Sequence, residues 1–153
     1  MKIEERLSEL GIDLPEERKA LASYVPGKKV GNLLFISGQD CSVDGEFIFK
    51  GRVGEEITLE KGKDAAKQCI INALSVIKKE AGGFENVEQI VKMLGFVNSA
   101  HDFHEQPYVI NGASDLLEEV FGDNGKHARS AIGTSNLPFN IPVEIELIVE
   151  LKE

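Results

Sequence analysis

Apolar residues recur at spacings of three and four in two long stretches of the chain, which is the pattern of a helix with one buried face. The first stretch is residues 59–81, and Gly82-Gly83 ends it because glycine favours helix termination. The second stretch is residues 107–121, and a glycine again follows its last apolar position. The sequence therefore predicts two helices that pack one side each against a core.

The amino-terminal part of the chain has shorter helical patterns. Residues 2–10 place three apolar residues on one face. Pro15 then favours a helical turn at residues 16–22, because proline is accepted in the first turn of a helix.

Segments rich in β-branched and aromatic residues predict strands. Residues 143–151 alternate, which is typical of a strand with one buried face, whereas residues 30–37 hold a continuous apolar run. Asp44-Gly45 is a turn signal that predicts a hairpin strand at residues 47–49. Two further strands are expected at residues 87–97 and 128–135.

This order of elements predicts an α+β fold. Two helices among six strands indicate a single mixed six-stranded sheet with both helices on one face. The other face of the sheet is then bare and largely apolar, and such a face favours self-association. A chain of 153 residues fits one ordinary core.

The charge of the chain bears on its partners. Seventeen Lys and Arg against 26 Asp and Glu give a net charge of −9, which disfavours nucleic acid and anionic membrane surfaces as partners. The amino terminus lacks the apolar region of a signal peptide, and no stretch reaches the roughly 18 apolar residues that span a bilayer. We therefore expect a cytoplasmic protein.

Common sources of chemistry have little support in the sequence. Cys41 and Cys69 form no CxxC pair, and Cys69 lies in a helical apolar pattern typical of a core residue. His101 and His104 lie in a strand-to-helix connection without a third ligand nearby, so a solvated loop is favoured over a metal site. The glycines lack the spacing of a phosphate-binding loop. No metal and no cofactor are expected.

The run from Arg129 to Glu146 is the strongest candidate for a functional site. Arg129 opens an apolar strand, where a guanidinium is costly unless it is paired. It can form an ion pair with a glutamate such as Glu144 on an adjacent strand, or it can bind a substrate carboxylate in a bidentate way. Residue chemistry alone leaves these two interpretations equal.

Several segments, in this order and spacing, resemble the Rid/YjgF family of small trimeric proteins, whose well-studied members are enamine/imine deaminases. The matching segments are Tyr24-Val25-Pro26-Gly27, Leu34-Phe35-Ile36-Ser37-Gly38-Gln39, Gln68 to Leu74, Val91-Lys92-Met93 with Phe96-Val97, Ala128-Arg129-Ser130, Leu137-Pro138 and Val143-Glu144-Ile145-Glu146. The resemblance makes residues 23–153 the family domain and residues 1–22 a helical extension. It also implies a chorismate mutase-like fold and a barrel-like homotrimer with pockets in the clefts between subunits.

The resemblance further implies a reaction, the hydrolysis of 2-imino acids to 2-keto acids and ammonia. Arg129 matches the arginine that binds the substrate carboxylate, and Glu144 matches the glutamate that positions the attacking water. The other residues that match the family's pocket are Tyr24, Ser37, Gly38, Asn111 and Ala131, the last through its backbone carbonyl.

The chain departs from the deaminases near Arg129. Deaminases often carry a cysteine where this chain has Ala131, and residues 121–126 differ as well. These departures motivate an alternative to the deaminase, a non-catalytic trimeric module that binds small carboxylates such as 2-keto acids and has a regulatory role. Nucleic-acid cleavage is sometimes attached to this family, but the net charge of −9 argues against it.

Overall fold

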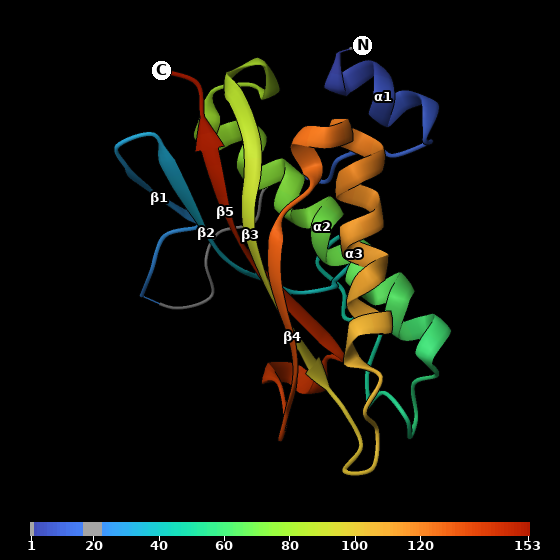
Figure 1. Cartoon of the computed structure of the whole chain (residues 1–153). Helices are drawn as coiled ribbons and strands as arrows, with labels where there is room; N and C mark the ends of the chain where they lie inside the picture. Colours follow the sequence, from blue (N-terminus) through green and yellow to red (C-terminus); the bar gives the residue numbers. More distant parts are fainter. Residues whose placement is uncertain (1, 17–22) are drawn as a thin grey trace.

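The computed structural model describes residues 2–16 and 23–153, and within them five strands form one mixed sheet in the order β1-β2-β5-β3-β4 (Figure 1). The strands are β1 (Gly27–Val30), β2 (Leu33–Gln39), β3 (Val87–Asn98), β4 (Ala128–Thr134) and β5 (Val143–Leu151). β3 and β4 are parallel, and the other neighbours are antiparallel. The sheet is open rather than closed, and a barrel-like homotrimer stays a prediction.

Helices α2 (Leu59–Ala81) and α3 (Gln106–Phe121) cover one face of this sheet, as predicted (Figure 1). The Thr58 side chain caps the start of α2 by accepting a hydrogen bond from the Lys61 amide at 3.2 Å. Gly82 ends α2 in the left-handed conformation, with φ of 74°. The core fills the space between the two helices and the sheet.

The alternation along β5 separates the two faces of the sheet. Val143, Ile145 and Leu147 are buried and face the helices, whereas Glu144 and Glu146 between them face the other side. The side without helices also carries apolar residues, among them Phe35 and Ile132, which are 41% and 45% exposed. This open face therefore carries both apolar residues and the acidic side chains of β5, whereas the sequence predicts a largely apolar face.

Two strand predictions need correction. The strand predicted at residues 30–37 is present from Leu33 onward as β2, but its start is wrong, because a two-residue turn at Gly31-Asn32 pairs Val30 of β1 with Leu33. Gly31 has a φ of 60°, which suits glycine and lets the chain reverse there.

The predicted strand at residues 47–49 is wrong, whereas β1 is a strand that the sequence does not predict separately from β2. The described sheet has five strands and not the six that were expected. The Asp44-Gly45 turn is present, with positive φ at both residues, and Val43 bridges to Glu46. The pairing then stops, and the Phe47 ring stacks on the Phe139 ring at a centroid distance of 4.9 Å. Side-chain packing holds this segment instead of a sheet ladder.

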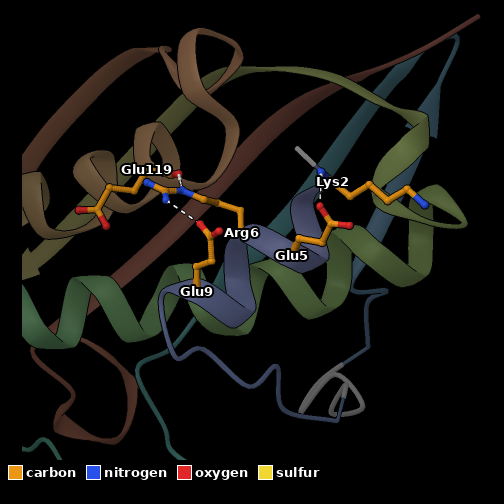
Figure 2. A network of polar contacts seen from close by, with 5 residues as sticks. All are labelled: Lys2, Glu5, Arg6, Glu9 and Glu119. Carbon is orange, nitrogen blue, oxygen red and sulfur yellow. Dashed lines mark hydrogen bonds and ion pairs between the residues drawn. The ribbon is translucent and has the colours of Figure 1, made fainter.

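The predicted amino-terminal helix is present as α1 (Ile3–Glu9), which lies against α3 (Figure 2). Arg6 Nε donates to the Glu119 carbonyl at 2.7 Å and so satisfies an acceptor in the last turn of α3. Leu7 is buried beside it. The helical turn predicted at residues 16–22 depends on residues 17–22, which lie outside the described residues.

In the described ranges, no helix combines the length and the apolar character that crossing a bilayer requires.

Candidate functional site

Arg129 lies on β4, an edge strand of the sheet (Figure 1). It faces the helices, because it pairs with Met93, which is buried and contacts Ser114 of α3. Arg129 Nη1 donates to Asn111 Oδ1 at 2.9 Å and to Ser114 Oγ at 3.0 Å. Arg129 Nη2 donates to the Pro107 carbonyl at 3.3 Å. Three groups of α3 therefore hold the guanidinium in one orientation.

All three of these acceptors are neutral. Within the described residues, no carboxylate lies at ion-pair distance from Arg129. A guanidinium has five N–H donors, and the three bonds to α3 leave two of them for another partner. A fixed, partly buried cation with two remaining donors is suited to bind a carboxylate bidentately.

Glu144 lies on the open face of the sheet, two strands away from β4. Burial raises the pKa of its carboxyl group, and the negative charges of Asp40 and Glu146 raise it further. Gly38 makes room for this carboxyl group. A Cβ atom at Gly38 would lie only 3.0 Å from Glu144 Cδ and 3.2 Å from Glu144 Cγ.

Tyr24 and Ser37 lie on the same open face of the sheet, where they line a groove of about 670 Å³. Ser37 Oγ donates to the Val25 carbonyl at 2.6 Å, which holds the segment that carries Tyr24. Lys92 and Glu146 also line this groove.

The predicted site residues therefore form two separate groups. Arg129 and Asn111 lie together on the helix side, and Ala131, two residues along β4, faces the same way. Tyr24, Ser37, Gly38 and Glu144 belong to the open face. An ion pair between Arg129 and Glu144 within one chain is wrong as an interpretation, because the two side chains lie on opposite faces of the sheet.

Sequence reasoning missed two residues beside Arg129. Ser114 accepts a hydrogen bond from Arg129, and His127 Nε2 lies 2.9 Å from Ser114 Oγ. A signal for Ser114 was present, since it follows Asn111 by three positions on a helix, which places both residues on one face. His127 lies just before β4 rather than on it, so its contact with Ser114 depends on how this segment packs on α3.

The two cysteines, which are far apart in the sequence, are neighbours in the core. A hydrogen bond from Cys69 lowers the pKa of Cys41, whereas burial raises the pKa of Cys69 well above its ordinary value. Cys69 Sγ also lies 3.5 Å from the Val143 carbonyl, an alternative acceptor for its single proton. Cys69 is thus the buried core residue that the sequence predicts.

The other candidates take no part in these groups. His101 and His104 are exposed in the connection between β3 and α3, as expected. Across residues 2–16 and 23–153, no cluster of three or more His, Cys, Asp or Glu side chains has the arrangement of a metal site.

Known proteins resemble this chain over nearly its whole length. Residues 4–151 match the family model described as "YjgF/chorismate_mutase-like, putative endoribonuclease". Protein TCP17 of Trypanosoma cruzi is 38% identical over 151 residues, which cover 98% of this chain and 94% of that protein.

A relative and a solved structure extend the comparison. The 2-iminobutanoate/2-iminopropanoate deaminase of Dermatophagoides farinae is 30% identical over 141 residues, which cover 92% of this chain and 95% of that protein. The crystal structure of a "putative endoribonuclease" from Shewanella oneidensis MR-1 superposes on this chain with a TM-score of 0.96, and the two sequences are 33% identical. The match covers 99% of this chain and 100% of that one. The chain therefore belongs to the Rid/YjgF family.

Proposed function

We propose that this protein hydrolyses reactive enamines and imines of 2-amino acids. In the imine form, water adds to the imine carbon, the C–N bond breaks, and a 2-keto acid and ammonia are released. The relative from Dermatophagoides farinae bears the name of such a deaminase.

The observation that carries the proposal is the way Arg129 is held. Asn111, Ser114 and the Pro107 carbonyl fix the guanidinium without neutralising it. Every 2-imino acid and 2-keto acid carries a carboxylate next to the reacting carbon, so a carboxylate bound here holds that carbon in a defined place. Holding the reactants in place contributes strongly to the rate of a reaction that already proceeds in water.

We assign to Glu144 the task of positioning the water that attacks the imine carbon. This role requires a second copy of the chain. Glu144 lies on the open face and Arg129 lies under α3, so one chain does not bring them together. A neighbouring copy that packs on the open face can bring its own Glu144 group to the Arg129 of the first. The apolar character of that face supports such packing, and we infer a homotrimer with one site at each subunit boundary.

In the assembled site, Glu144 of one subunit orients the attacking water and accepts its proton. The Ala131 carbonyl of the other subunit holds the same water from a second side. A carboxylate with a raised pKa is a stronger base than an ordinary glutamate, which suits this role.

A non-catalytic module that binds 2-keto acids is the second candidate. The observation in its favour is Ala131, which carries no reactive side chain at a position two residues from Arg129. This candidate keeps the Arg129 anchor but predicts no turnover.

The test is the release of 2-keto acid from an enzymatically generated 2-imino acid, measured with and without the protein. We expect faster release with the wild type and background release with Arg129→Ala. Arg6→Ala is the matched control, because Arg6 also donates to α3 but at the opposite end. Equal rates with and without wild-type protein, across several imino acids, would reject the deaminase. If such a protein still bound pyruvate, and Arg129→Ala abolished that binding, the non-catalytic binding module would be the remaining candidate.

A further inference from the structure

His127 is connected to the guanidinium of Arg129 by a chain of hydrogen bonds that the proposed reaction does not use. The His127 side chain is half-buried just before β4. Its Nδ1 lies 2.6 Å from the Gly125 carbonyl, and its Nε2 lies 2.9 Å from Ser114 Oγ. The same Oγ accepts from Arg129 Nη1 at 3.0 Å.

The partners determine where the protons lie in the neutral imidazole. The Gly125 carbonyl only accepts, so Nδ1 carries the proton and donates to it. Nε2 is then an acceptor, and the Ser114 hydroxyl must donate to it. In this state, Ser114 offers no proton to a ligand of Arg129.

The fold keeps the histidine in this position. A side chain at Gly125 would collide with the Leu117 carbonyl, so this glycine allows η2 (Gly122–Gly125) to pack closely on α3. The close packing leaves the Gly125 carbonyl 2.6 Å from Nδ1 of the imidazole. The segment at residues 121–126, which differs from the deaminases, therefore holds His127 in place beside the proposed anion site.

We propose that His127 is a positioning residue that controls, through Ser114, how many donors the Arg129 site offers to a carboxylate. The proposal rests on the proposed function of Arg129 as the carboxylate anchor. When His127 gains a proton, Nε2 becomes a donor to Ser114 Oγ. The Ser114 hydroxyl proton is then released from His127 and can point to the bound anion.

Two physical effects then favour the anion in the protonated state. The carboxylate gains one donor, and the positive charge of the imidazolium lies near the guanidinium. The other nearby acceptor for the hydroxyl is Met93 Sδ at 3.9 Å, but a thioether is a weak acceptor compared with a carboxylate. Binding of 2-keto acids should therefore strengthen as pH falls.

Other charged groups also surround His127 and need a control. The elements around it are α3, η2, β4 and β3, and their charged side chains near His127 in sequence or register are Asp115, Glu118, Asp123, Lys126, Arg129 and Lys92. Asp123 and Lys126 pair with each other at 2.9 Å on the surface. Glu144 of a neighbouring subunit adds a further group that titrates. Removal of the imidazole separates the effect of His127 on binding from theirs.

The test is isothermal titration calorimetry of the protein with pyruvate, which stays ionised between about pH 8 and about pH 5.5, the range in which histidines ordinarily titrate. We expect the wild-type Kd to fall at least about fivefold across this range. His127→Gln should bind with a Kd that changes less than about twofold, because its amide does not titrate. The control is the double variant His101→Gln and His104→Gln, which removes the other two histidines and should behave as wild type.

A second measurement does not depend on a variant. By linkage, pyruvate must move the midpoint of the His127 titration, followed by NMR, to higher pH by the same factor. An unchanged midpoint in the presence of saturating pyruvate would overturn the proposal. The same holds if His127→Gln keeps the wild-type pH dependence, or if wild-type binding does not change with pH. Absence of pyruvate binding at every pH would instead reject the Arg129 anchor itself.

Discussion

At the scale of single residues, Arg129 and Glu144 differ in how their surroundings treat the charge of the side chain. The guanidinium of Arg129 is held by neutral acceptors and keeps its charge for another partner. The carboxyl group of Glu144 lies among other negative charges and is partly buried, which raises its pKa. Charged groups in such surroundings are often found at functional sites, which agrees with the roles that we propose for both residues.

Glu144→Gln should separate stability from activity. The raised pKa means that the folded state disfavours the ionised form, so the charge destabilises the protein above the folded pKa and the penalty disappears below about pH 4.3, the ordinary value for glutamate. We expect Glu144→Gln to abolish turnover and to raise the melting temperature slightly at neutral pH but not at about pH 4. Glu88→Gln, on the exposed start of β3, controls for the loss of one charge. A lower melting temperature at neutral pH would contradict this account.

Gly38→Ala tests the space beside Glu144. The new Cβ atom would lie 3.0 Å from Glu144 Cδ, so the carboxyl group must shift by a few tenths of an ångström. We expect kcat to fall by about tenfold to a hundredfold, because small misplacements of a catalytic group are costly, while the protein stays folded. Steady-state kinetics and circular dichroism measure the two effects. Unchanged kcat would show that the position of Glu144 does not limit the reaction.

At the scale of elements, the sequence predicts those strands and helices whose apolar residues recur with a regular period. It does not predict segments whose conformation depends on packing against residues far away in the sequence. The alternation of β5 is clear because one face is buried, and its bounds at residues 143–151 were predicted correctly. The segment at residues 47–49 has strand composition, but Phe47 packs on Phe139, far away in the sequence. The hairpin at Gly31-Asn32 was missed although Gly-Asn is a known two-residue turn signal.

The same distinction applies to the candidate site. The family pattern gave Arg129, Glu144 and Asn111 from the sequence. The face on which Arg129 lies depends on the parallel pairing of β4 with β3, and one sequence does not show that register. The link from Ser114 to His127 depends in turn on how α3 packs over β4.

Leu7→Ala tests whether α1 serves stability alone. Leu7 is buried, and truncation of a core leucine ordinarily costs about 2 kcal/mol or more. Because Arg6 of the same helix contacts the Glu119 end of α3, whereas Arg129 bonds toward the Pro107 end, anion binding should not change. Urea denaturation should show the loss in unfolding free energy, and pyruvate titration of the folded protein should give the wild-type Kd. A weaker Kd would show that α1 also shapes the site.

At the scale of the whole molecule, the account depends on how two incomplete groups of residues are joined. One chain carries the Arg129 group under α3 and the Glu144 group on the open face, and these do not meet. The apolar open face gives copies of the chain a reason to associate. The central claim is therefore that each site takes Arg129 from one subunit and Glu144 from its neighbour.

Subunit mixing tests this claim most directly. Arg129→Ala and Glu144→Gln proteins, each inactive alone, are unfolded together, refolded as an equal mixture and assayed for 2-keto acid release. In a randomly mixed trimer population, about three quarters of the trimers contain both variants and each of these has one intact site, so about a quarter of wild-type activity should return. Refolded wild type gives the reference rate, and mass spectrometry verifies that mixed trimers have formed. Mixed trimers with no more activity than either variant alone would contradict the account.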